Sequence, residues 1–425
     1  MTRKMKNSGI EWIGEIPEEW NIGKLKKYAY LKTGATPSTK NQEIFKGEFK
    51  WFTPGDFNES LILKNSFRHL NKDYVAENIV PIYPKNSVLI VGIGATIGKL
   101  GFTTEESSSN QQITAIMSKE DIDSKFLLYM MLASVDVIKQ TALFTTLPIL
   151  NNQTLGETLI LNLPKKQQIK IANYLNHKCI KIDQIIEKQK QVIKKLKEYK
   201  QSIITEAVTK GLNPNVNMKD SGVEWIPEHW DINHIKYILK FNPGYNENLK
   251  ENDEVSFAPM ETLKNDKLEP VISTMDKVKG GYTYFANEDI IMAKVTPCFE
   301  NGNIAIATNL KNGVGFGSSE LYVFRCTKVN NRFIFYYLQN EIFRQRCIST
   351  MYGTGGLKRV SSNYVYNYKL ALPNLNEQQE IANYLDEKCK SIDKSIAQKE
   401  KLIEKLTEYK KSLIYEYVTG KREVK

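Results

Sequence analysis

The chain has little of what a disulfide framework or a metal site needs. Its five cysteines are an odd number with no Cys-x-x-Cys spacing, and it has only four histidines, which argues against both kinds of site. No run of about 18 apolar residues exists, so no transmembrane helix is expected. The basic start, MTRKMKNSG, leads into acidic residues and not into the apolar core of a signal peptide. We therefore expect a cytoplasmic protein with reduced thiols and no membrane contact.

The motifs of nucleotide-dependent enzymes are also missing. In the glycine-rich stretch from Gly92, Ile93 and Leu100 stand where a phosphate-binding P-loop needs glycine and Ser or Thr. The Asn/Asp-Pro-Pro-aromatic motif of adenine methyltransferases is absent. Glu-x-Lys triplets such as the one at Glu198 lie on expected helices, where a solvated charged face explains them better than a nuclease site. The sequence therefore shows no catalytic residues, and we interpret the glycine-rich stretch as a connection between strands.

Positive charge is in excess. The 425 residues carry a formal net charge of +11, with 41% hydrophobic and 10% aromatic residues. That composition is typical of globular cores, and the length allows two to three domains. A basic protein favours a polyanionic partner, because lysines and arginines that neutralise phosphates release condensed counterions. The alternative is a basic protein whose lysines are simply solvated.

The chain repeats itself. The segment SGIEWIGEIPEEW at residues 8–20 returns as SGVEWIPEHW at residues 221–230, and IANYLNHKCIKID from Ile171 returns as IANYLDEKCKSID from Ile381. Trp20 and Trp230 are 210 residues apart, as are the two isoleucines. A tandem duplication with a period near half the chain predicts two similar modules.

Two long helices are predicted at residues 165–210 and 374–419, because neither range contains proline or glycine. Apolar residues in both follow a heptad pattern, which is interrupted at the same place by Gln189 and Lys399. The first range has 12 Lys and 4 acidic residues, and the second has 8 Lys and 9 acidic residues. These surfaces suit pairing within one molecule, although each helix could instead pack only on its own domain. Gly211 and Pro214 predict the end of the first helix.

The regions between the helices read as mixed strand, turn and short helix. SVLIVGIG at residues 87–94 and DIIMAKV at residues 289–295 are β-rich, and KFLLYMML and RFIFYYLQ resemble short buried helices. The predicted fold class is α+β. It has two similar mixed α/β domains separated by two long antiparallel helices, related by an internal pseudo-two-fold duplication. The expected divisions are residues 1–164, 165–210, 211–373 and 374–425.

Small, polar and basic residues gather in expected loops. Glycines let a loop approach a DNA backbone closely, while Lys, Arg, Ser and Thr contact phosphates or base edges. On this ground the candidate DNA contacts in the second half are Lys279, Tyr282, Lys294, Thr296, Lys358, Arg359 and Ser361. In the first half, the glycine-rich turn contributes Thr96 and Lys99. A turn with an incidental lysine would have the same sequence pattern.

In their order along the chain, these motifs resemble the specificity subunit of Type I restriction-modification systems. The first recognition domain carries family-like sequence at KTGATP from Lys32, WFTPGD from Trp51, GATIGK from Gly94 and NQQ from Asn110. The second carries FAPME from Phe257, AKVTPC from Ala293, GFGSSE from Gly315 and GTGGLKRVS from Gly353. Gln-Gln pairs at residues 167–168 and 378–379 mark the starts of the helices. Gly14-Glu15-Ile16 has no counterpart before Pro227, so the halves differ in detail.

The resemblance implies a non-catalytic subunit that reads double-stranded DNA. Each recognition domain would read one half of a bipartite target, and the helix pair would set the spacing between the halves. It adds Thr36, Lys40, Gln111 and Gln112 to the candidate contacts of the first half. Two modification subunits with S-adenosylmethionine would methylate adenine, and restriction subunits with ATP and Mg would translocate and cleave DNA. This chain would hold no cofactor or metal.

Two other functions remain open. An enzyme, such as a fused methyltransferase or nuclease, would transfer methyl groups or cleave DNA by itself. A coiled-coil assembly scaffold would not contact DNA, so changes at Lys294, Lys358 or Arg359 would leave DNA binding absent or unchanged.

Overall fold

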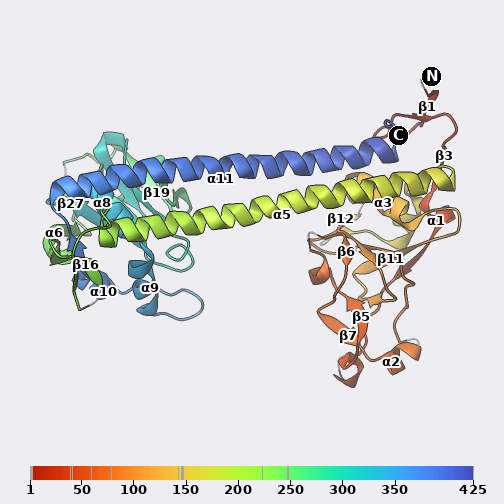
Figure 1. Cartoon of the computed structure of the whole chain (residues 1–425), viewed down its shortest axis with the longest axis horizontal. Helices are drawn as coiled ribbons and strands as arrows, with labels where there is room; N and C mark the ends of the chain where they lie inside the picture. Colours follow the sequence, from red (N-terminus) through yellow and green to blue (C-terminus); the bar gives the residue numbers. More distant parts are fainter. Residues whose placement is uncertain are drawn as a thin grey trace. The chain divides into compact units, whose positions relative to one another are not determined.

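A computed structural model of the chain describes residues 3–38, 40, 42–58, 60–77, 79–141, 143–144, 148–222, 224–246 and 248–424. Contacts divide the chain into two compact units. Unit 1 comprises residues 1–189 and 401–425, and unit 2 comprises residues 190–400. The two longest helices, α5 (Lys165–Lys210) and α11 (Leu375–Val418), each contribute to both units (Figure 1).

Unit 1 is built on a five-stranded sheet of order β4-β11-β8-β9-β6 and a three-stranded sheet of order β10-β5-β7. The central strand β8 has the sequence VLIV and is buried along its whole length, as expected of a strand covered on both faces. The strands of the two sheets are β4 (Ala29–Thr33), β5 (Phe49–Phe52), β6 (Ile62–Leu63), β7 (Arg68–Leu70), β8 (Val88–Val91), β9 (Leu100–Thr103), β10 (Ser108–Ser109) and β11 (Ile113–Ser118).

Shorter elements complete unit 1. Three strand pairs and several helices lie outside the two sheets: β1 (Met5–Asn7) with β2 (Glu15–Pro17), β3 (Asn21–Lys24) with β14 (Leu159–Asn162), β12 (Leu143–Phe144) with β13 (Pro148–Ile149), α1 (Leu25–Tyr28), η1 (Gln42–Phe45), η2 (Pro54–Asp56), α2 (Lys72–Ala76), α3 (Ser124–Gln140) and α4 (Asn152–Glu157). Asp123 is the N-cap of α3, because its carboxylate accepts hydrogen bonds from the backbone N–H groups of Lys125 and Phe126 at 3.0 and 2.9 Å.

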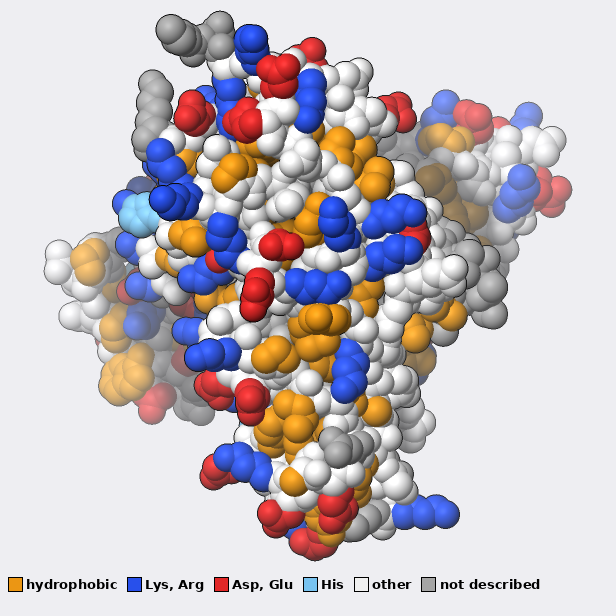
Figure 2. All heavy atoms as spheres, turned by 90° about the vertical axis from the view of Figure 1, so that its right-hand side faces the viewer, with side chains coloured by type: hydrophobic (Ala, Val, Ile, Leu, Met, Phe, Trp, Pro, Cys, Tyr) orange, Lys and Arg blue, Asp and Glu red, His pale blue; other side chains and the backbone are white. Residues whose placement is uncertain are grey.

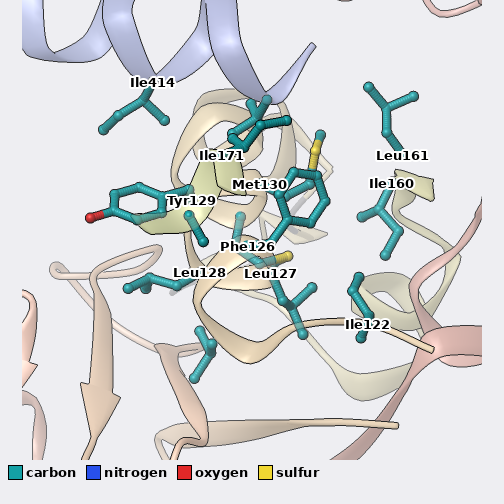
Figure 3. Packing of buried hydrophobic residues seen from close by; sticks show 14 of the residues in the cluster. Ile122, Phe126, Leu127, Leu128, Tyr129, Met130, Ile160, Leu161, Ile171 and Ile414 are labelled. Carbon is teal, nitrogen blue, oxygen red and sulfur yellow. The ribbon is translucent and has the colours of Figure 1, made fainter. Parts of the chain in front are cut away.

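The core of unit 1 joins the five-stranded sheet and α3 to the long helices. Phe126 and Met130 of α3 are fully buried in one cluster with Ile171 of α5 and Ile414 of α11 (Figure 3). Burial of a side chain of this size stabilises a fold by about 1.5–3 kcal/mol. The helices are therefore part of the core of unit 1 and not a detached stalk.

Unit 2 contains two four-stranded sheets, β18-β27-β24-β25 and β22-β19-β26-β23. Their strands are β18 (Leu239–Phe241), β19 (Glu254–Ala258), β22 (Val271–Thr274), β23 (Thr283–Ala286), β24 (Ile290–Ala293), β25 (Ile304–Ile306), β26 (Val314–Gly317) and β27 (Leu321–Cys326). The remaining elements are β15 (Met218–Asp220) with β16 (Trp225–Pro227), β17 (Asp231–His234) with β28 (Lys369–Leu372), β20 (Leu263–Lys264) with β21 (Lys267–Leu268), α6 (Ile235–Ile238), η3 (Met260–Thr262), α7 (Met275–Val278), η4 (Lys311–Gly313), α8 (Asn331–Tyr337), α9 (Glu341–Ser349) and α10 (Ser362–Asn367).

The duplication extends to single hydrogen bonds. In unit 1 the buried Trp20 indole donates its Nε1 hydrogen to Gln167 Oε1 at 3.1 Å. In unit 2 Trp230, also buried, makes the same bond to Glu377 Oε1 at 3.1 Å. The two tryptophans are 210 residues apart in the sequence, and so are their two acceptors. The repeated opening segments are thus tied to the start of the long helix in each unit.

The two long helices pair antiparallel, with one related ion pair in each unit. In unit 1 Lys410 Nζ lies 2.6 and 2.7 Å from the carboxylate oxygens of Asp183. In unit 2 Lys200 Nζ lies 2.9 and 2.7 Å from those of Asp393. Asp183 corresponds to Asp393 and Lys200 to Lys410, since each is followed by its counterpart 210 residues later. Residues of the predicted heptad seams are buried or half-buried, among them Cys179, Ile182, Ile193, Ile203, Cys389, Ile392, Ile396 and Leu413. The α+β fold with two related domains and paired long helices is confirmed.

Among the described residues, no helix combines the length and the apolar character needed to span a membrane.

Candidate nucleic-acid interface

In unit 1 two predicted residues lie together beside the end of β4. The Thr36 hydroxyl donates a hydrogen bond to Gln111 Oε1, and both side chains are exposed. The chain before Thr36 is fixed, since the backbone N–H of Ala35 donates to Ser109 O at 2.9 Å and Trp51 Nε1 donates to Ala35 O at 3.1 Å. A rigid polar edge results, with hydroxyl and amide groups facing solvent.

The glycine-rich stretch connects β8 to β9, as predicted. Gly94 and Gly98 have φ values of +98° and +81°, a conformation that favours glycine. The backbone N–H groups of Gly98 and Lys99 donate to Val91 O at 2.8 Å and Thr96 O at 3.1 Å, which closes a tight turn with Thr96 half-exposed. β8 and β9 pair antiparallel on either side of it.

Gln112 adjoins this turn. Its backbone carbonyl accepts a hydrogen bond from Gly92 N–H at 2.7 Å, and its side-chain Oε1 accepts one from Asn110 Nδ2 at 2.9 Å. The Lys99 ammonium donates to Phe57 O at 3.1 Å, which anchors the side chain on the neighbouring loop. Lys40 is exposed, and only its backbone N–H makes a described hydrogen bond, to Ser38 Oγ at 3.4 Å. Thr36, Gln111 and Gln112 therefore share one edge, which the β8–β9 turn adjoins.

In unit 2 Lys294, Thr296, Lys358 and Arg359 come from two segments that the fold brings together. Thr296 N–H donates to Lys358 O at 2.9 Å, and Thr296 Oγ1 donates to Gly356 O at 2.8 Å. Lys294 Nζ donates to Ser319 O at 2.7 Å and lies 5.2 Å from the centre of the Tyr322 ring. The glycine-rich loop is thus closed onto the end of β24.

The Arg359 guanidinium makes an ion pair that the sequence does not signal. Its Nε lies 3.0 and 2.9 Å from the two carboxylate oxygens of Glu320, and Nη2 lies 2.7 Å from Oε1. These hydrogen bonds lower the pKa of Glu320 below its ordinary value. The carboxylate therefore stays ionised at neutral pH.

The other three predicted residues of unit 2 differ in their surroundings. Ser361 is the N-cap of α10, and its Oγ accepts a hydrogen bond from Tyr364 N–H at 3.3 Å. The Tyr282 ring is 44% exposed and packs edge-on against Phe257, with ring centres 4.7 Å apart. Lys279 is exposed at the end of α7. No described contact joins these three side chains to the Arg359 group.

Phe67 is a surface feature for which the sequence offers no signal. Its side chain is 84% exposed, whereas its backbone N–H is held by the buried Asp56 carboxylate at 2.7 Å. Figure 2 shows that basic, acidic and hydrophobic side chains of the described residues are interspersed on the face it views. On that face the surplus of positive charge is therefore not gathered into one patch.

Comparison with known families decides the relationship. The family model described as the Type I restriction modification DNA specificity domain matches residues 17–198 and again residues 227–408, so its two copies begin and end 210 residues apart. The chain belongs to the Type I restriction-modification DNA specificity family. The predicted family is confirmed, and each copy includes part of a long helix.

Relatives within the family differ in how much of their length is matched. The specificity subunit of the Type I restriction enzyme EcoAI from Escherichia coli is 29% identical over 233 residues, which are 53% of this chain and 39% of that protein. The MjaVIII specificity subunit from Methanocaldococcus jannaschii is 22% identical over 96% of this chain and 94% of its own length. The chain thus matches about two-fifths of the Escherichia coli relative and nearly all of the archaeal one.

Solved structures of the family share the fold. One, described as the structural basis underlying complex assembly and conformational transition of the type I R-M system, gives a TM-score of 0.71 at 12% identity, over 95% of this chain and 98% of that one. The crystal structure of the HsdS subunit from Thermoanaerobacter tengcongensis gives 0.51 at 13% identity, over 96% and 98%. At these identities the likeness concerns the fold alone.

Proposed function

We propose that this chain is the DNA specificity subunit of a Type I restriction-modification complex. Each unit reads one half of a bipartite target, and the complex methylates or cleaves DNA according to that reading. The observation that carries the proposal is the match of a DNA specificity domain in each half of the chain. Around the shared framework, the polar edges differ, with Thr36 and Gln111 in one unit and Arg359 and Glu320 in the other. A shared framework with different edges suits the reading of two unlike sequences.

The long helices act in this proposal as the spacer between the two readers. A helix of 46 residues, such as α5, extends about 69 Å at roughly 1.5 Å per residue. Two half-sites one DNA turn apart are separated by roughly 34 Å. The helices are thus long enough to span such a gap, and their buried seams and ion pairs stiffen them against bending.

Catalysis belongs to partner subunits in this proposal. Two modification subunits dock on the repeated segments and the helices, carry S-adenosylmethionine and methylate adenine. Restriction subunits supply ATP- and Mg-dependent translocation and cleavage. The chain contributes recognition of double-stranded DNA and no chemical step, and the complex works in the cytoplasm.

Single-molecule sequencing of methylated DNA tests the proposal. Cells would express this chain with its neighbouring modification subunit, and the control cells would lack only this chain. The proposal predicts a split, asymmetric motif methylated at adenine on both strands, present only with the chain. Absence of chain-dependent methylation, with the two subunits soluble and associated, would contradict it and favour an assembly scaffold without DNA contact.

A further inference from the structure

The Arg359–Glu320 pair uses only one edge of the guanidinium. Glu320 accepts hydrogen bonds from Nε and Nη2, which form the side edge of the group. The adjoining end edge, formed by Nη1 and the second hydrogen of Nη2, has no acceptor among the described residues. The Arg359 side chain is 40% exposed and that of Glu320 is 25% exposed. The guanidinium therefore presents two parallel N–H donors outward.

Both ends of the Arg359 side chain are fixed. Its backbone N–H donates to Tyr352 O at 2.8 Å, and its carbonyl accepts from Tyr352 N–H at 3.1 Å. The next residue, Val360, is fully buried, and its N–H donates to Lys294 O at 2.9 Å. An arginine held in this way has already lost most of its rotamer freedom before DNA binds, so little more is lost on contact.

The net charge around an arginine distinguishes a contact with a DNA phosphate from a contact with a base. A phosphate contact gains affinity from net positive charge, because it releases counterions from DNA. The Arg359–Glu320 pair is close to neutral, and its carboxylate would repel a phosphate. A base contact needs direction more than net charge, and two parallel N–H donors match the O6 and N7 acceptors of guanine in the major groove. Lys358, next to Arg359 in the sequence, is exposed, so its charge is available for a phosphate of the DNA backbone.

We propose that Arg359, positioned by Glu320, reads one guanine in the half of the DNA target that unit 2 recognises. The inference rests on the proposed function and adds the base, the reading residue and the positioning residue. Glu320 acts through Arg359: it holds the plane of the guanidinium so that the outward edge meets the base edge.

Motif mapping of variants tests this reading. Arg359→Ala and Arg359→Lys would each be expressed with the modification subunit, and the methylated motif compared with that of the unchanged chain. We expect one G·C position in the second half-target to accept other bases, with discrimination falling roughly 5- to 150-fold, the equivalent of about 1–3 kcal/mol. The first half-target stays unchanged. Glu320→Gln relaxes the same position to a smaller extent.

The lysine variant separates a base contact from a phosphate contact. Lysine keeps the charge but lacks the planar pair of donors. A uniform loss of methylation in Arg359→Ala that Arg359→Lys restores, with the motif unchanged, would overturn the proposal. The matched control is Lys311→Ala, which removes an exposed lysine paired with Glu254 in the same unit and should leave the motif unchanged.

A DNA substitution provides a test that needs no stable variant. Replacing the guanine by 7-deazaguanine removes the N7 acceptor, so binding of the unchanged complex should weaken roughly 5-fold or more. Equal binding of both duplexes would overturn the proposal, as would a second half-target without any G·C pair. If the unchanged chain directs no methylation at all, the proposed function itself fails, which is a distinct result.

Discussion

The ion pair between Asp183 and Lys410 should stabilise the contact of α5 with α11 in unit 1. At 2.7 Å, Coulomb's law gives about 1.5 kcal/mol in water and about 6 kcal/mol at an effective dielectric constant of about 20. Lys410 is 16% exposed and Asp183 is 48% exposed, so solvent screens much of this energy. Measured exposed pairs contribute about 0.2–1 kcal/mol. Because both carboxylate oxygens are engaged, we expect a coupling energy of about 0.5–1 kcal/mol.

A double-mutant cycle measures that coupling. The free energy of unfolding would be determined by urea titration, followed by circular dichroism, for the unchanged chain, Asp183→Ala, Lys410→Ala and the double variant. Because the chain has two units, it can unfold in more than one transition. The coupling energy is taken from the unfolding transition whose midpoint the single substitutions shift. In 1 M salt, where the Debye length is about 3 Å, the coupling should fall to less than about half.

The duplication supplies a replicate and a control. The related cycle of Lys200 and Asp393 in unit 2 should give a coupling energy within about 0.5 kcal/mol of the first, since its distances and exposures are nearly the same. The pair of Lys194 and Glu198 along α5 is 3.9 Å apart, with side chains 81% and 64% exposed, and should couple by less than about 0.5 kcal/mol. Coupling energies of zero in both interhelical cycles would refute the reasoning.

Three further predictions concern spacing, packing and thiols. Inserting seven residues into both long helices, after Gln191 and Lys401, should lengthen them by about 10.5 Å and the gap in the methylated motif by about 3 base pairs, with both half-targets kept; an unchanged gap would contradict the spacer. Gly34→Ala should lower the free energy of unfolding by about 1–3 kcal/mol, because a Cβ there would clash with the backbone oxygens of Ser109 and Asn110. Gly55→Ala should change it by less than about 0.5 kcal/mol, because the nearest described atom outside the adjoining residues, Thr53 Oγ1, would lie 3.8 Å from the added Cβ. Cys298 and Cys326 are half-exposed and the other three cysteines are buried, and burial raises the thiol pKa to about 11 in Cys179 and Cys389 and to about 12 in Cys326 and Cys347. A disulfide reagent at pH 8 should therefore give one fast phase, at Cys298, which Cys298→Ser should remove.

The long helix of residues 165–210 could be predicted because its signals are local. Its range lacks proline and glycine, and the structure ends the helix before Gly211, whose φ is +78°. The β8–β9 connection was predicted for the same reason, since glycines mark it. The short helix expected around Lys125 is longer in the structure, where α3 extends over 17 residues. Its counterpart in unit 2, α8, ends at Tyr337, and a second helix, α9, begins after Asn340.

Contacts between distant segments could not be predicted. Arg359 and Glu320 are 39 residues apart, and no periodicity links a loop residue to a strand end. Ser361 shows the converse difficulty: a polar residue before a helix has the signature of an N-cap as well as of a DNA contact. Its role in DNA binding stays a prediction, as do those of the other candidate contacts.

The most direct test of the account exchanges one reading region and keeps the other. Residues 231–373 would be replaced by the matching region of another family member with a known target, and the methylated motif mapped by single-molecule sequencing beside that of the unchanged chain. We expect one half of the motif to become that of the donor, while the other half keeps its sequence. A change in both halves, or in neither, would contradict the reading of one half-target by each unit.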